Sequence, residues 1–236
     1  MRRTRKGMDK KEQGLKFNHL FYPSRKKEAE VRGGGRGEEK GKALSITLFL
    51  LHGTGGNEED LIPLGNEIAP GAAILSPRGK VLENGMPRFF RRLAEGVFDL
   101  EDLKFRTYEL ADFVKEASKI YGFDLKSLLG IGYSNGANIA ASVLLLRPNI
   151  LSNAILFRPM VPLVPDFLPD LRSKHVLISA GLHDPIVTSQ ETKNLLDLLQ
   201  KAGADVSINW QNSGHELTSD EVRKARDWLF SKITPY

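Results

Sequence analysis

Cysteine is absent from the 236-residue chain, and so is any long apolar run. The lack of cysteine excludes disulfides, thiolate metal sites and a cysteine nucleophile. Because no apolar stretch approaches the roughly 18 residues that cross a bilayer, we expect no membrane span. The basic N-terminus is not followed by the apolar segment of a secretory signal. We therefore expect a cytoplasmic protein, with either Met1 or Met8 as the true start.

The positive charge is concentrated near the N-terminus. The chain has a net charge of +5, and residues 1–43 hold 14 basic and 6 acidic side chains. The remainder is therefore slightly acidic, whereas a nucleic-acid-binding protein would more often carry a basic face on its fold. Arg25–Lys42 is rich in glycine and charge and is expected to be a mobile loop. We predict two parts, a basic segment 1–44 with a first strand and this loop, and a folded domain 45–236.

Short apolar runs alternate with amphipathic patterns along the chain. The runs expected to form strands are Leu15–Tyr22, Ile46–Leu51, Ala72–Leu75, Leu128–Tyr133, Ala154–Phe157, Val176–Ala180 and Val206–Trp210. The expected helices are Glu58–Ile68, Asp102–Tyr121, Asn135–Leu146, Gln190–Ala202 and Asp220–Ile233. Thr188–Glu191 and Thr218–Glu221 match the capping box that starts a helix. This alternation predicts an α/β fold with a mainly parallel sheet of about seven strands and helices on both faces.

Ser134 lies in Gly132–x–Ser134–x–Gly136, directly between a predicted strand and a predicted helix. This setting is typical of the strained turn that exposes a nucleophilic serine in α/β hydrolases. Glycine is needed on either side because larger side chains would collide with the turn. A glycine-rich turn with an incidental serine is the plain alternative. A nucleotide loop fits poorly, because Gly130–x–Gly132–x–x–x–Gly136 has one residue too many and no GKS or GKT motif occurs.

The order serine, acid, histidine in this fold selects the partners of Ser134. His215 follows the last predicted strand after a short loop, whereas the other histidines precede the serine, lie at a strand's amino end or adjoin the candidate acid. Those are His19, His52, His175 and His183. Asp184 directly follows a predicted strand, beside Pro185, and we favour it over the other aspartates considered. Those are Asp166, Asp170, Asp197 and Asp205. His215 would act as general base, and Asp184 would fix its tautomer.

A glycine-rich loop, His52–Gly56, follows the second predicted strand. Such a loop can present a backbone N–H to a tetrahedral intermediate, and the N–H after the nucleophile supplies a second donor. We assign this oxyanion hole to Thr54 and Asn135. For His52 we favour a structural role, in which it braces the loop.

The segments LLHGTGG, GYSNGANIA, GLHDPIV and SGHE together resemble the carboxylesterase/phospholipase branch of the α/β hydrolases, from about residue 45 to the C-terminus. That branch includes small bacterial esterases and acyl-protein thioesterases. Residues 86–92 and 156–160 are similar to a bacterial subgroup of hydrolases or carboxylesterases, which includes proteins induced by hydroquinones. The charged insertion before residue 45 departs from the pattern. The resemblance implies hydrolysis of carboxylic esters or thioesters without a metal or cofactor.

We therefore expect a serine carboxylesterase that acts on a small-molecule ester through an acyl-enzyme. A thioesterase or lysophospholipase would use the same three residues, and a binding protein on a hydrolase scaffold would usually lack one of them. The sequence leaves the natural acyl group and the oligomeric state open, with a homodimer as one option.

The substrate pocket is expected to be open and shallow. Between the predicted strands only Arg158–Arg172 is free, a proline-rich and apolar stretch too short for a separate cap domain. Arg158 and Met160 from this stretch and Phe89 from residues 79–98 are the expected substrate contacts. Three more arginines could meet an anionic substrate but are more typical of a solvated surface, namely Arg88, Arg91 and Arg92. We expect a preference for short to medium acyl chains.

Overall fold

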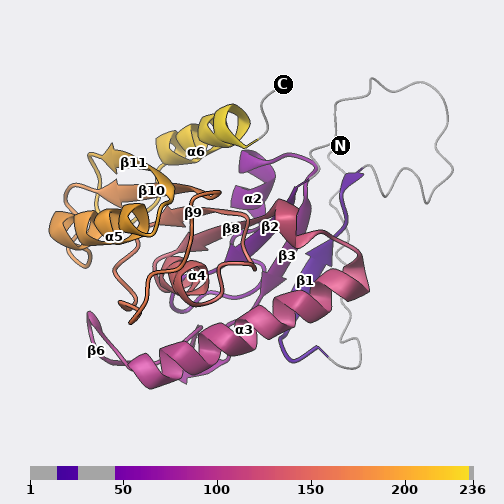
Figure 1. Ribbon diagram of the computed structural model, residues 1–236, viewed down its shortest axis with the longest axis horizontal. Coiled ribbons are helices and arrows are strands. Elements are labelled where there is room, and N and C mark those ends of the chain that lie inside the picture. The colour runs from indigo at the N-terminus through magenta and orange to yellow at the C-terminus, as the bar shows by residue number, and fades with distance from the viewer. Residues whose placement is uncertain (1–14, 26–45, 234–236) are drawn as a thin grey trace, which may run out of the picture.

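The computed structural model describes residues 15–25 and 46–233. Its core is a seven-stranded sheet in the order β1-β3-β2-β8-β9-β10-β11 (Figure 1). The strands are β1 (His19–Tyr22), β2 (Thr47–Leu51), β3 (Ala73–Pro77), β8 (Leu128–Tyr133), β9 (Asn153–Phe157), β10 (His175–Gly181) and β11 (Asp205–Gln211). Only β1 runs antiparallel to its neighbour, so the sheet is mainly parallel, as predicted.

Helices cover both faces of the sheet because its central strands are apolar on both sides. Leu48 and Leu50 of β2 pack on one face with helices α2 (Ile62–Ile68) and α6 (Ser219–Lys232). Phe49 and Leu51 point to the other face, which is covered by α3 (Leu100–Tyr121), α4 (Asn135–Leu146) and α5 (Ser189–Lys201). Figure 1 shows α3 and α6 on opposite sides of the sheet. The predicted α/β-hydrolase architecture is thereby confirmed.

Most predicted boundaries agree with the structure to within two residues, but two element starts and one predicted cap differ more clearly. The first helix of the domain begins at Ile62 and not at Glu58, because Pro63 lies in its first turn, where a missing N–H costs nothing. The first strand is shorter than predicted and begins at His19. Thr218 forms the full capping box at α6, whereas at α5 only the Thr188 hydroxyl accepts its backbone hydrogen bond.

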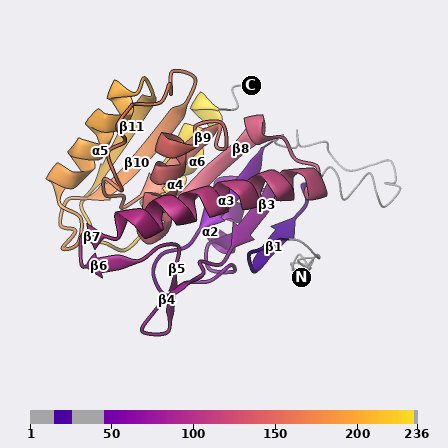
Figure 2. The ribbon, with the colours of Figure 1, turned by 60° about the horizontal axis from the view of Figure 1, so that its bottom comes forward.

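Residues 81–98, which the strand predictions left out, form two short hairpins. They are β4 (Val81–Glu83) with β5 (Met86–Arg88), and β6 (Arg92–Ala94) with β7 (Val97–Phe98). The first turn holds Asn84 and Gly85, both with positive φ, which is the preferred chemistry of a two-residue hairpin. Figure 2 shows β6 and β7 beside the N-terminal end of α3, and β4 and β5 below this helix. Residues 158–174, between β9 and β10, contain neither helix nor strand, so no cap domain is inserted there.

The predictions for the basic segment mostly fall on residues that the structure does not describe. Residues 1–14 and all of the Arg25–Lys42 loop except Arg25 lie outside the described ranges, so the division at residue 44 stays a prediction. Within 15–25, β1 forms an edge of the central sheet against β3. None of the helices in the described ranges is both long and apolar enough to span a bilayer.

Candidate active site

The turn between β8 and α4 holds Ser134 in an unusual backbone conformation, with φ 52° and ψ −114°. A Cβ on Gly132 would lie 2.5 Å from the carbonyl oxygen of Gly136. A Cβ on Gly136 would lie 2.0 Å from the carbonyl oxygen of Leu51, at the end of β2. Both positions therefore require glycine, and the serine stands at the carboxyl end of the sheet where α4 begins, as predicted.

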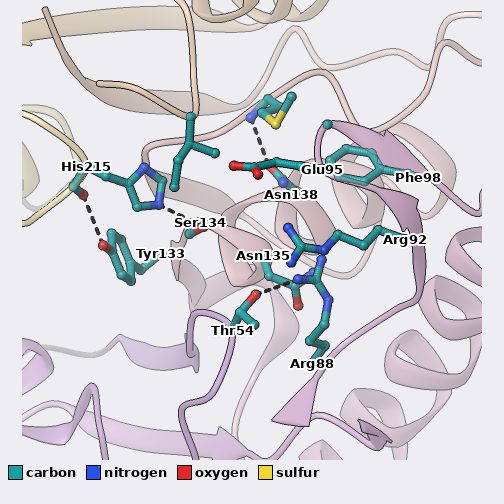
Figure 3. A pocket seen from close by; sticks show the side chains of 13 residues that line it. Thr54, Arg88, Arg92, Glu95, Phe98, Tyr133, Ser134, Asn135, Asn138 and His215 are labelled. Carbon is teal, nitrogen blue, oxygen red and sulfur yellow. Dashed lines mark hydrogen bonds between the residues drawn. The ribbon is translucent and has the colours of Figure 1, made fainter. Parts of the chain in front are cut away.

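Ser134, His215 and Asp184 form one hydrogen-bonded chain, although they come from three separate loops. His215 Nε2 lies 3.0 Å from Ser134 Oγ, and His215 Nδ1 lies 2.8 Å from Asp184 Oδ2. Figure 3 shows the imidazole of His215 pointing at the Ser134 hydroxyl across the mouth of a cavity. The acid bonds to Nδ1, so this tautomer carries its proton there and offers Nε2 as the acceptor for the hydroxyl proton.

Asp184 is held by the turn in which it lies. Its Oδ1 accepts hydrogen bonds from the backbone N–H groups of Ile186 at 2.8 Å and Val187 at 2.9 Å. Its side chain is almost fully buried, so its second oxygen is directed at His215 without competition from bulk water. The local fold thus fixes the orientation of the carboxylate toward the imidazole.

His52 braces the glycine-rich loop after β2. Its Nδ1 donates to the carbonyl of Gly53 at 2.6 Å, and its Nε2 accepts from the backbone N–H of Gly79 at 2.9 Å. Burial lowers the pKa of His52 below its ordinary value, although the carbonyl of Gly53 and nearby carboxylates oppose this. The ring is therefore neutral, which fits the structural role expected from the sequence.

Thr54 and Asn135, the expected oxyanion donors, both line the cavity at Ser134. Thr54 Oγ1 accepts a hydrogen bond of 2.7 Å from Arg88 Nη1. Asn135 Oδ1 accepts one of 2.8 Å from the backbone N–H of Phe89. The hairpin residues 86–89 therefore fix both positions, and the backbone N–H of Gly55 adds a bond to the carbonyl of Pro87 at 2.9 Å.

The cavity has a volume of about 330 Å³ and lies at the carboxyl end of the sheet. Its lining residues come from the glycine-rich loop, the hairpins, the serine turn and the loops after β9, β10 and β11. They are Thr54, Arg88, Arg92, Glu95, Gly96, Phe98, Tyr133, Ser134, Asn135, Asn138, Met160, Ile186 and His215. Met160 is where the sequence placed it. Phe89 is a correction, because it is buried against the ring of His52 and does not line the cavity.

Arg158 is the second correction among the expected substrate contacts. Its side chain is 0% exposed and forms a salt bridge with Glu221 of α6. The guanidinium also donates to the carbonyl oxygens of Gly214 at 2.9 Å and Glu216 at 2.7 Å, and to Ser213 Oγ at 3.0 Å. With its donors used in this way and no surface exposed, it has no face left for a substrate.

The Arg158–Glu221 pair instead supports the loop that carries His215. Burial alone would raise the pKa of Glu221, but hydrogen bonds from Arg158 and Ser179 hold it below its ordinary value, so the carboxylate is charged. The guanidinium contacts the residues on both sides of His215, and its Nε lies 3.8 Å from Asp184 Oδ2. Arg158 therefore links the acid and the histidine loop to the core.

The sequence reasoning missed several cavity residues. Tyr133, next to the serine, donates its hydroxyl to the carbonyl of His215 at 3.0 Å. Asn138, one helical turn after Ser134, accepts the backbone N–H of Met160 at 2.8 Å. Their closeness to Ser134 in the sequence could have indicated both. Arg88 was expected on the surface, yet only 4% of its side chain is exposed.

The chain is similar over most of its length to known hydrolases, although no protein-family model matches it. MhqD of Bacillus subtilis (strain 168), named as a hydrolase, is 51% identical over 195 residues, covering 83% of this chain and 97% of MhqD. The Bacillus cereus carboxylesterase is 49% identical with a TM-score of 0.82, over 91% of this chain and 94% of that one. YahD, solved with malic acid, is 33% identical with a TM-score of 0.79, over 90% and 98%.

Replacing Arg158 with methionine is expected to destabilise the protein by about 3–5 kcal/mol, because Glu221 is left as an unpaired buried charge. Hydrolytic activity should fall further than the loss of folded protein explains, since the His215 loop loses its donors. The double variant Arg158→Met/Glu221→Gln should recover stability, because glutamine keeps the capping position without a charge. Its kcat should stay low. Denaturant unfolding and ester turnover measure the two effects, and full activity in the double variant would contradict a role in positioning His215.

Proposed function

The chain belongs to the carboxylesterase family of α/β hydrolases, and from this premise we propose that it is a serine carboxylesterase. It hydrolyses small carboxylic esters in two steps, through an acyl-enzyme on Ser134. The observation that carries this proposal is the hydrogen-bonded series from Asp184 through His215 to Ser134. A hydroxyl, a base and a group that orients the base are the parts that activate a serine.

Each residue has a role that follows from its contacts. His215 takes the proton of Ser134 as the hydroxyl attacks the ester carbonyl, and then returns it to the departing alcohol. Asp184 holds the tautomer and stabilises the imidazolium that forms. In the second step His215 takes a proton from water, which attacks the acyl carbonyl; the bond to Ser134 Oγ breaks, the acid is released, and His215 returns the proton to Ser134.

The negative charge that develops on the carbonyl oxygen needs fixed donors. The backbone N–H groups of Thr54 and Asn135 are proposed to supply them. The start of α4 at Asn135 adds the positive end of a helix dipole. The hydrogen bonds that Arg88 donates to Thr54 and that the backbone N–H of Phe89 donates to Asn135 hold both residues before substrate arrives. Donors that are already in place cost no reorganisation during the reaction.

The cavity volume of about 330 Å³ favours a small substrate. YahD was solved together with malic acid, a compact molecule, which agrees with this size. A thioesterase or lysophospholipase would use the same three residues and is the second candidate. Its longer acyl chain would have to extend beyond this cavity. A cytoplasmic location stays part of the proposal.

Replacing Ser134 with alanine is expected to lower kcat for a neutral ester by a factor on the order of 10⁴–10⁶, because nucleophile and base act as one unit. Folding should be nearly unchanged. The matched control is Ser118→Ala on α3, which should keep full activity. A fluorophosphonate should label the wild type at Ser134, as read by mass spectrometry of its peptides. Labelling at another residue would refute the assignment.

Replacing Asp184 with asparagine is expected to lower kcat by about 10⁴, because an amide favours the wrong tautomer of His215. The control is Asp166→Asn, which replaces an exposed aspartate between β9 and β10 and should behave as wild type. Steady-state kinetics of ester hydrolysis measure the effect. If Asp166→Asn is the damaging change, Asp184 is not the acid.

Chain-length preference should separate the two candidate functions. Because the cavity is small, we expect kcat/KM for nitrophenyl esters to be highest for short to medium acyl chains in a series from acetate to palmitate. No jump in rate should occur when the substrate forms micelles. An optimum at palmitate, or activation by micelles, would instead favour a long-chain thioesterase or a lysophospholipase.

A further inference from the structure

One wall of the cavity is basic, and neither of its two arginines is among the groups that react in the proposed chemistry. Arg88 and Arg92 both line the cavity, with 4% and 30% of their side chains exposed. Figure 3 shows their guanidinium groups near each other, on the other side of Ser134 from His215. The two arginines also share an acidic partner, Glu83, which places them close together.

The positive charge of this wall exceeds what its partner can neutralise. Glu83 is bound by Arg92 through Nε at 2.9 Å and Nη2 at 2.7 Å, and it lies 3.3 Å from Arg88 Nε. The other bonds of Arg88 go to neutral oxygens, Thr54 Oγ1 and the carbonyl of Phe90. One carboxylate therefore faces two guanidinium groups. Burial lowers the pKa of Arg88, so an anion beside it would relieve the cost of keeping its charge.

A third donor, on another residue that lines this cavity, lacks a partner. The Nδ2 atom of Asn135 is buried and has no hydrogen-bond acceptor among the residues that the structure describes. Only 2% of Asn135 is exposed, and the residue lines the cavity. Its Oδ1 is already used by the backbone N–H of Phe89, which assigns the unused end as the N–H donor. A buried donor without an acceptor is costly, and a ligand oxygen would satisfy it.

Among the described residues that line the cavity, Glu95 alone is acidic, and it opposes this charge only weakly. It is exposed in the turn between β6 and β7, where water screens its field. Arg88 lies deeper, where the lower dielectric strengthens electrostatic attraction. An anion is thus repelled weakly at the rim and attracted inside.

We propose that Arg88, Arg92 and Asn135 form a subsite for a carboxylate in the acyl part of the substrate, so that the preferred esters are half-esters of small dicarboxylic acids. This inference rests on the proposed esterase function. The acyl part is assigned because the leaving alcohol must lie beside His215, which returns its proton. The arginines lie away from His215, on the side of Thr54 (Figure 3).

The test compares monoethyl succinate with ethyl butyrate, which have a four-carbon acyl chain with and without the terminal carboxylate. Hydrolysis yields ethanol and either succinate or butyrate, so released ethanol measures both reactions. The ratio of their kcat/KM values should exceed about ten in the wild type and fall about tenfold or more in Arg92→Gln. Arg92→Lys should retain part of the preference, because the charge remains. Added salt should lower the ratio, since it screens the attraction.

Arg91→Gln is the matched control, because Arg91 is 62% exposed, pairs with Asp99 and does not line the cavity. It should keep the wild-type ratio. Any general loosening of the hairpins by Arg92→Gln lowers both rates and cancels in the ratio. A wild-type ratio of one or less, or a ratio that Arg92→Gln leaves unchanged, overturns the subsite.

Failure of the esterase proposal can be recognised separately. If the wild type cleaves neither of these esters nor any nitrophenyl ester, the proposed function is wrong. Calorimetric binding to the inactive Ser134→Ala variant then tests the subsite without turnover. Monoethyl succinate should bind more tightly than ethyl butyrate, and Arg92→Gln in the same background should remove the difference. Equal binding of the two esters overturns the inference.

Discussion

The buried guanidinium of Arg158 joins four parts of the molecule that must keep their relative positions. Arg158 directly follows β9, in a left-handed backbone conformation with φ 54°. Its backbone N–H donates a hydrogen bond to the carbonyl oxygen of Ser179 in β10. The side chain reaches the His215 loop and ends on Glu221 in α6. Taking two charges out of water costs several kcal/mol per ion, so the pair persists only because nearly every donor and acceptor finds a partner. The consequence of this strained backbone and these desolvated charges is that the loop that brings His215 to Ser134 is held in place.

A second constraint acts from the other side of Ser134. The carbonyls at the end of β2 approach Gly136 so closely that no side chain fits between them, which brings the glycine-rich loop against the start of α4. Ser134 and Thr54 consequently share one rigid frame. The histidine loop is fixed by a charged network and the glycine-rich loop by backbone contact, so the groups on both sides of an ester would be held independently of the substrate.

Local patterns predicted much of this arrangement. The apolar runs located the seven strands, because buried parallel strands require apolar residues on both faces. Spacing and chain order selected Ser134, Asp184 and His215, since the fold restricts which loops can meet. Arg158 could not be placed in this way, because its partner Glu221 lies 63 positions away. An arginine after a buried strand suits a salt bridge in the core as well as a substrate contact, and only the three-dimensional neighbours decide. The Asn84–Gly85 pair is a local signal for the first hairpin, and the strand predictions did not use it.

The hairpins connect substrate recognition to the proposed chemistry. Arg88 lines the cavity and also holds Thr54, while the backbone of the next residue, Phe89, holds Asn135. A carboxylate bound by Arg88 would therefore contact the residue that positions Thr54, one of the two proposed oxyanion donors. A carboxylate at this wall would bring Arg88 and Arg92 a second counter-ion and so relieve the repulsion between them. Binding energy from the remote end of the substrate would then hold the ester carbonyl against donors that are already in place, and would contribute to kcat as well as to affinity.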